Sequence, residues 1–245
     1  MKVLVTRPVG RAPATVKALW ACHITAICDP MLTVEPIANS SIEIPTCQAL
    51  AITSVAAAEL LGIYISEVTK PIFAVGDTTA RTALRNGFPN VRSANGDVST
   101  LVDLIVNSAD PADGQLLHLG GEDVAGNLVQ ALRLRGFCAE HAPIYRVFEA
   151  TTFRPPTIAA FRKTEIGGVL FFSPRSARAF VRLLSLRQAA FSLNRVTAFC
   201  LSTAVARETE SVGWQNILIS EHPTMASLVE LVAAHRNMPL ENHRV

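Results

Sequence analysis

Short apolar runs alternate along nearly the whole chain with segments whose apolar residues recur every three or four positions. The runs have the length of buried strands, and the intervening segments, such as the one with Leu101, Leu104 and Ile105, have the period of helices. This alternation predicts parallel sheets covered by helices on both faces. The predicted strands are Val3–Thr6, Thr25–Cys28, Ala49–Thr53, Ile72–Val75, Asn90–Ser93, Leu116–Leu119, Gly168–Phe172, Val196–Leu201 and Asn216–Ser220.

The chain also matches itself twice, each time at a nearly constant offset. Ala74–Arg81 resembles Cys200–Arg207, and the segment 2–30 resembles the segment 115–143. Repeated units of this size are domains rather than solenoid repeats. We therefore expect an α/β protein with two similar domains, each a doubly wound, mainly parallel sheet flanked by helices.

The matched segments occur in a different order in the two copies, which predicts that one domain is discontinuous. We expect residues 1–35 and 150–245 to form one α/β domain, and residues 38–143 to form the other. Linker strands near 32–37 and 144–149 would join them. Two domains that face each other make a cleft, where we expect a ligand to bind.

Composition limits the functional classes. The chain has 245 residues, of which 49% are hydrophobic and 17% charged, as in a packed globular protein. A net charge of +2 with scattered basic residues argues against a nucleic-acid partner. The first apolar run ends at Arg7 and Pro8 and is too short to span a membrane. Five cysteines without a CxxC spacing indicate reduced thiols, so we expect a cytoplasmic location.

Candidate binding residues follow the predicted strands. Ligands of doubly wound sheets bind beyond the carboxyl ends of the strands, where helix N-termini present free N–H groups. Small and hydroxylated residues stand at these places, namely Ser54, Gly76, Thr79, Ser173 and Ser202. Each could equally be an ordinary helix cap. Together they would surround an anionic ligand with amide dipoles.

Two further side chains are candidates for contact with a ligand. Arg7 ends the first strand, where its guanidinium could bind a carboxylate through two hydrogen bonds, although an ordinary surface arginine is the alternative. Tyr145 lies on a predicted linker strand, where its phenol could donate a hydrogen bond to a ligand or pack in a hinge.

The sequence contains none of the common cofactor or nucleophile motifs. It has no GxGxxG, no GxxxxGK[ST] and no GxSxG, and its six histidines lack metal-ligand spacing. We therefore predict no cofactor and no metal. Asp77, Glu122 and Asp123 are acids at strand ends, but acids at helix starts usually balance the helix dipole.

Taken together, these segments resemble the uroporphyrinogen-III synthase family over nearly the whole chain. Two places depart from the family pattern. Gly120 stands where many members carry arginine, and Ala204 and Val205 replace threonines. The matching segments are Val3–Pro8, Thr53-Ser54, Val75–Ala80, Leu119–Glu122, Ile144-Tyr145 and Phe172-Ser173.

The resemblance implies a cofactor-free enzyme whose substrate is hydroxymethylbilane, a linear tetrapyrrole polycarboxylate. The enzyme would remove water, invert the last pyrrole ring through a spiro intermediate, and close the macrocycle to uroporphyrinogen III in haem biosynthesis. Tyr145 would assist hydroxide departure. A monomer in transient contact with the enzyme that supplies the bilane is implied as well. The residues expected to bind substrate carboxylates are Arg7, Ser54, Gly76, Thr79, Ser173 and Ser202.

Two other functional classes are compatible with the residues alone. The first is a non-catalytic, two-domain cytosolic protein that binds or senses a small molecule. The second is a phosphosugar-binding or isomerising protein, which would use the same helix ends for phosphate. Binding of a bilane without turnover would favour the first, and competition by sugar phosphates would favour the second.

Overall fold

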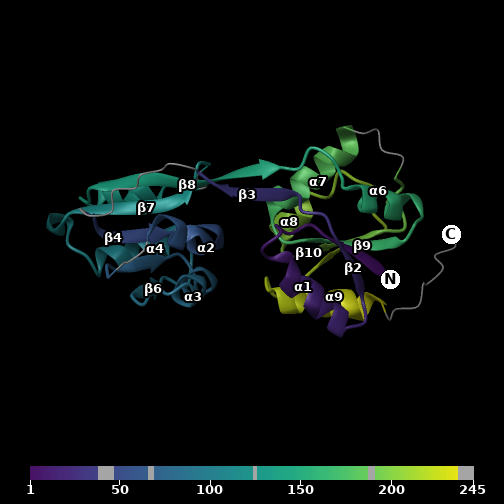
Figure 1. The fold of residues 1–245 in the computed structure, drawn as a ribbon, viewed down its shortest axis with the longest axis horizontal. Helices are drawn as coiled ribbons and strands as arrows, with labels where there is room; N and C mark the ends of the chain where they lie inside the picture. The colour runs from purple at the N-terminus through teal and green to yellow at the C-terminus, as the bar shows by residue number, and fades with distance from the viewer. Residues whose placement is uncertain (38–46, 66–68, 124–125, 187–190, 237–245) are drawn as a thin grey trace. The chain divides into compact units, whose positions relative to one another are not determined.

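The computed structural model is a mixed α/β structure with two mainly parallel sheets flanked by helices, so the predicted fold class is confirmed (Figure 1). The chain divides into two compact units. Unit 1 comprises Met1–Thr33 and Phe148–Val245, and unit 2 comprises Val34–Val147. Residue 38, where one predicted domain begins, lies outside the described residues. The structure describes residues 1–37, 47–65, 69–123, 126–186 and 191–236.

Unit 1 is built on a five-stranded sheet with the order β11-β10-β9-β1-β2, in which neighbouring strands are parallel. The central pairing joins β1 to β9, so the start of the chain pairs with a segment from its second half. This unit is therefore discontinuous in sequence. The strands are β1 (Lys2–Val5), β2 (Thr25–Cys28), β9 (Ile166–Phe171), β10 (Thr197–Cys200) and β11 (Asn216–Ile219).

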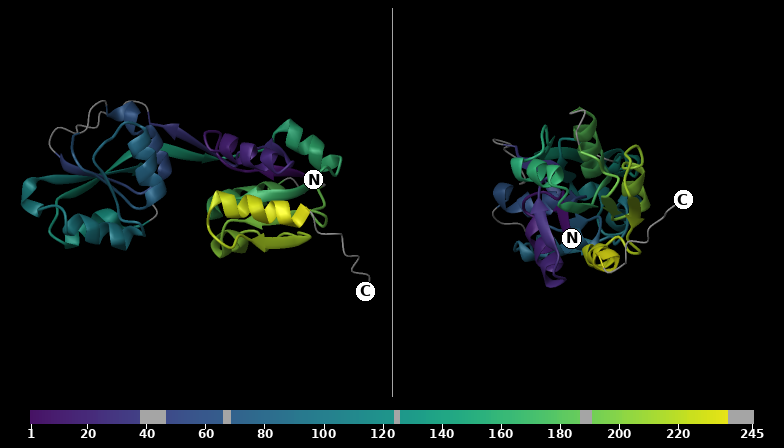
Figure 2. Two further views of the ribbon diagram at one scale, coloured as in Figure 1. Left: turned by 90° about the horizontal axis from the view of Figure 1, so that it is seen from below. Right: turned by 90° about the vertical axis from the view of Figure 1, so that its right-hand side faces the viewer.

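Helices cover both faces of the unit 1 sheet. On one face, α1 (Ala12–Ala21) and α9 (Met225–Arg236) pack their apolar residues onto β1 and β10, and Figure 2 shows α9 in yellow alongside the strands. On the other face, Phe171 and Phe180 meet edge to face with ring centroids 5.2 Å apart. The helices on that second face are α6 (Pro155–Arg162), α7 (Pro174–Leu186) and α8 (Thr203–Arg207).

Unit 2 is built on a six-stranded sheet with the order β3-β8-β7-β4-β5-β6. The pairs β8–β7, β7–β4, β4–β5 and β5–β6 are parallel. A short 3₁₀ turn, η1 (Pro111–Asp113), precedes β7. The strands are β3 (Leu32–Pro36), β4 (Cys47–Ile52), β5 (Ile72–Ala74), β6 (Val91–Ser93), β7 (Gln115–Gly121) and β8 (Ala139–Glu149).

Successive side chains of β4 point to opposite faces of the unit 2 sheet, and each face has its own apolar core. Leu50 and Ile52 belong to the core beneath α2 (Val55–Tyr64) and α3 (Asp77–Arg85). Ala49 and Ala51 point the other way, into the core beneath α4 and α5. The two helices on that face are α4 (Val98–Val106) and α5 (Leu128–Leu134).

The two sheets share one strand order. Read from one edge, unit 1 runs β2-β1-β9-β10-β11, and unit 2 runs β8-β7-β4-β5-β6 with β3 added beside β8. Strands whose sequences match occupy equivalent positions in the two sheet orders. The matching segments therefore have equivalent places within their sheets, although they occur in a different order along the chain. The largest difference from the predicted boundaries is the start of β8, which lies at Ala139, well before the predicted linker strand. Ala139 is already paired with Leu116 of β7.

Gly168 of β9 is a position where the unit 1 core has no room for a side chain. A Cβ there would lie 2.5 Å from Cε2 of Phe199, whose side chain is fully buried. We expect Gly168→Ala to lower the free energy of unfolding by about 1–3 kcal/mol, the usual cost of overpacking. The measurement is urea denaturation at equilibrium.

Gly62→Ala is the matched control for Gly168→Ala. Gly62 lies in α2, where an added Cβ would have no heavy atom within 4 Å, so alanine should leave stability unchanged or raise it by about 0.5–1 kcal/mol. Equal stability of Gly168→Ala and the wild type would contradict the close contact with Phe199.

Candidate active site

The carboxyl ends of the unit 2 strands bring two of the sequence-predicted residues together. Ser54 follows β4, and its Oγ lies 3.0 Å from Oη of Tyr145 on β8. The same Oγ accepts a hydrogen bond of 3.0 Å from the backbone N–H of Ala57, so Ser54 also caps α2. The tyrosine ring is buried and lies against Gly121, where a Cβ would be 2.8 Å from its Cε2. The phenol is thus fixed by packing on one side and by Ser54 on the other.

Gly76 and Thr79 both lie at the start of α3, but they face different surroundings. Gly76 is the N-cap in an extended conformation, and a Cβ added there would have no heavy atom within 4 Å. Thr79 points inward and is only 5% exposed. Its backbone N–H belongs to the first helical turn, which has no intrahelical acceptor. Asp77 of the same turn accepts a hydrogen bond of 2.7 Å from the Ser93 hydroxyl.

The unit 1 candidates lie at the ends of β1, β9 and β10. The Arg7 guanidinium stacks on Phe172, 4.4 Å from its ring centroid, and donates to the Thr15 hydroxyl at 3.1 Å. Ser173 accepts a hydrogen bond of 3.2 Å from the backbone N–H of Ser176. Ser202 is the N-cap of α8 and makes no side-chain cap bond. Arg7 therefore lies beside the strand end that carries Ser173, the neighbour of Phe172.

Sequence reasoning missed His118 and His141, which form a buried pair in unit 2. His118 of β7 is 2% exposed, and its Nε2 lies 3.0 Å from Oγ1 of Thr53. Burial, and after it the neighbouring His141, lower the pKa of His118 to about 4, so its ring is neutral at pH 7. The only sequence signal was a histidine within the apolar strand Leu116–Leu119.

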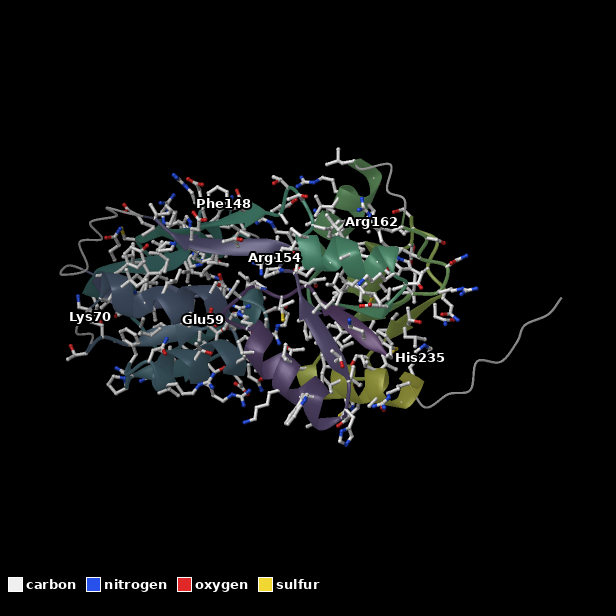
Figure 3. The ribbon with its side chains drawn as sticks, turned by 45° about the vertical axis from the view of Figure 1, so that its right-hand side comes forward. Glu59, Lys70, Phe148, Arg154, Arg162 and His235 are labelled. Carbon is white, nitrogen blue, oxygen red and sulfur yellow. The ribbon has the colours of Figure 1, made fainter. Side chains whose placement is uncertain are left out.

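Asp29 is a second residue that sequence reasoning missed. It follows β2, is 1% exposed, and accepts a hydrogen bond of 2.9 Å from the backbone N–H of Arg154. Burial raises the pKa of Asp29, and Arg154 partly opposes this shift. Figure 3 labels Arg154 at the start of α6, where its guanidinium also lies 3.9 Å from the Asp29 carboxylate. The aspartate therefore ties β2 to α6.

Within the described ranges, no group of three or more His, Cys, Asp and Glu side chains is placed to hold a metal ion. Among the same residues, no helix is long and apolar enough to cross a bilayer.

Comparison with known proteins identifies relatives. The profile of the family described as "Uroporphyrinogen-III synthase HemD" matches residues 14–230. No curated protein sequence matches the chain significantly. Solved structures share the fold at low sequence identity, and two of them are described next.

The first is uroporphyrinogen-III synthetase from Helicobacter pylori, with 17% identity and a TM-score of 0.67 over 96% of this chain and 99% of that one. The second is a mutant uroporphyrinogen III synthase from Thermus thermophilus, with 16% identity and a TM-score of 0.55 over 97% of this chain and all of that one.

The lowered pKa of His118 predicts a loss of stability in acid. An unfolded histidine takes up a proton near pH 6.5, whereas folded His118 stays neutral down to about pH 4. The unfolded state therefore binds more protons in this window, and stability falls as the pH falls from 6.5 towards 4.

We expect His118→Gln to lose less stability than the wild type between pH 7 and pH 4.5, by about 2 kcal/mol. Urea titrations at both pH values measure the difference. Equal losses in the two proteins would show that His118 does not titrate in the expected window.

Proposed function

The chain belongs to the uroporphyrinogen-III synthase family, and on this premise we propose how its residues perform the reaction. The enzyme cyclises hydroxymethylbilane to uroporphyrinogen III, with inversion of the last pyrrole ring and loss of water, in tetrapyrrole biosynthesis. The observation that carries the proposed mechanism is the contact of 3.0 Å between Ser54 Oγ and Tyr145 Oη.

The reaction requires two contributions from the protein. The linear bilane closes without help to the type I isomer, so the enzyme must hold it in a geometry that favours attack at the other position of the last ring. It must also help the terminal hydroxyl to leave. Breaking the carbon–oxygen bond places the electron pair on oxygen, and a proton donor at that oxygen turns the leaving group into water.

We assign the proton donor to Tyr145. Ser54 Oγ accepts a hydrogen bond from the backbone N–H of Ala57, and the Ser54 hydroxyl hydrogen can therefore be donated to Tyr145 Oη. In that arrangement the phenolic hydrogen of Tyr145 would be available to the substrate oxygen. The phenolate formed on transfer would lie beside the N-terminus of α2, whose dipole favours negative charge. It regains a proton when the closing macrocycle releases one, so the residue is restored after each turnover.

The carboxylates of the substrate are assigned to the remaining strand-end residues. Arg7 would bind a carboxylate through the edge of its guanidinium group, whose face is stacked on Phe172. Gly76, Ser173 and Ser202 would bind carboxylates together with the backbone N–H groups of the helices that follow them. Thr79 would act through its backbone N–H, because its side chain faces inward. Binding is therefore distributed over many weak contacts.

The wider setting of the reaction is part of the same proposal. The partner is a linear tetrapyrrole polycarboxylate, handed over by transient contact with the enzyme that makes it, and no nucleic acid takes part. The enzyme would act as a cytoplasmic monomer. All five cysteines are free thiols, which suits a reducing compartment.

The role proposed for Tyr145 is tested by removing its hydroxyl. We expect Tyr145→Phe to lower kcat by about 10²-fold, at the lower end of what a general acid contributes, with a KM close to that of the wild type. Hydroxymethylbilane is generated in the assay, and the porphyrin isomers are separated after oxidation. Nearly full turnover to the type III isomer would refute the role of Tyr145.

Tyr64→Phe is the matched control, because Tyr64 is the only other tyrosine. Its hydroxyl oxygen lies 3.1 Å from the carbonyl oxygen of Ile37 and 2.5 Å from that of Ile144, so its single hydrogen is donated to one of them or shared between both. This variant should lose about 1 kcal/mol of stability and lower kcat far less than Tyr145→Phe does, because it removes a bond to the backbone beside Tyr145 and leaves the proposed proton donor in place.

The proposal that many weak contacts share the binding of the substrate is tested at Thr79. We expect Thr79→Ala to lower kcat/KM by less than about tenfold, because one ordinary hydrogen bond is worth about 1 kcal/mol and the proposed contact is a backbone amide. Thermal unfolding of the variant separates loss of folding from loss of binding, since Thr79 is buried. A loss of about 10⁴-fold in a folded variant would contradict distributed binding.

A further inference from the structure

Two histidines lie side by side on neighbouring strands near the proposed active site. His118 of β7 pairs in register with His141 of β8, and their ring centroids are 4.9 Å apart. Both point to the face of the sheet covered by α4 and α5, since Leu116 and Ala139, two residues earlier on each strand, belong to the core on that face. The pair fills the space beside Gly120, where a Cβ would lie 3.1 Å from Cε1 of His141 and 3.3 Å from Nε2 of His118.

Each ring makes one hydrogen bond, and each bond ends on a strand terminus. His118 Nε2 lies 3.0 Å from the Thr53 hydroxyl. His141 Nε2 lies 3.0 Å from the carbonyl oxygen of Gly121. A carbonyl can only accept, so His141 carries its hydrogen on Nε2.

The second nitrogen of each ring is buried and has no partner. Nδ1 of both histidines is enclosed without a hydrogen bond among the described residues. A partly satisfied polar pair stabilises a core less than apolar side chains of the same size would. Stability therefore does not account for the pair, and its two bonds to the strand ends require another explanation.

Both hydrogen bonds lead to residues that hold Tyr145. Thr53 adjoins Ser54, whose Oγ lies 3.0 Å from the phenol oxygen. Gly121 lies directly against the tyrosine ring, and the neighbouring Glu122 donates its backbone N–H to the Tyr145 carbonyl at 2.8 Å. One histidine thus fixes the turn that contacts the hydroxyl, and the other fixes the strand end that contacts the ring.

We infer that His118 and His141 are positioning residues that fix the direction of the Tyr145 phenol by holding Thr53 and Gly121. This inference rests on the catalytic role proposed for Tyr145. The histidines do not touch the substrate, and they affect the chemical step rather than substrate binding. A loss of either hydrogen bond loosens one of the two supports of the phenol.

The decisive experiment compares His118→Leu with His118→Gln. Leucine fills the site without a hydrogen bond, whereas the glutamine amide nitrogen can take the place of Nε2 and donate to Thr53. We expect His118→Leu to lower kcat about tenfold with KM within about twofold of the wild type, and His118→Gln to regain most of the loss. Equal activity of the two variants, whether both are fast or both are slow, would overturn the inference.

A third variant keeps the experiment decisive if His118→Leu does not fold. The amide of His118→Asn is too short to reach Thr53, so this variant should be as slow as expected for leucine while the glutamine variant is fast. Thermal unfolding of all three variants is measured alongside the kinetics. An asparagine variant as fast as the wild type would overturn the inference.

A double-mutant cycle with Tyr145→Phe separates this inference from the proposed function. If His118 acts through Tyr145, His118→Leu should have less than a twofold effect on kcat once the phenol is removed. A slow Tyr145→Phe enzyme that His118→Leu slows about tenfold further would overturn the positioning role and leave the role of Tyr145 intact. A fully active Tyr145→Phe enzyme would overturn the role of Tyr145 and, with it, positioning through the phenol.

Discussion

The pairing of β7 with β4 on one side and β8 on the other is the constraint on which the candidate site depends. Parallel strands that pair in register end at the same edge of a sheet, and this edge collects Thr53, Gly121 and Tyr145. A shift of one residue would turn each side chain of the moving strand to the opposite face. The contact between Ser54 and Tyr145 is therefore a product of sheet register, although the two residues lie far apart in the chain.

The fold followed from the sequence to a large extent, because strands and helices leave periodic signals. The short apolar run near Leu50, for example, predicted β4, and the internal match of 2–30 with 115–143 placed β1 and β7 at equivalent positions. The start of β8 was not predicted, because Glu140, His141 and Pro143 break the apolar pattern before the expected linker strand near 144–149, and proline is disfavoured within a strand. Pro143 instead lies within the strand opposite Gly120, next to an irregularity in the pairing, where a missing N–H is tolerated.

The candidate site was less predictable than the fold. Residue type and strand position suggested Ser54 and Tyr145, but the rotation of α3 that buries Thr79 depends on tertiary packing. The histidine pair left almost no signal, because His118 and His141 meet only through the register of β7 and β8. Contacts between strands are a property of the assembled sheet, and local patterns do not encode them.

The pairing of β1 between β9 and β2, in the interior of its sheet, has a consequence for synthesis on the ribosome. β1 is translated before unit 2, but it pairs with β9, which emerges only after the whole of unit 2 has been translated. Chains fold domain by domain as they emerge, and distant pairings form late. We therefore expect unit 2 to fold during translation while the apolar residues of β1 and β2 stay exposed. These two strands would then be the part of the nascent chain most open to aggregation or chaperone binding.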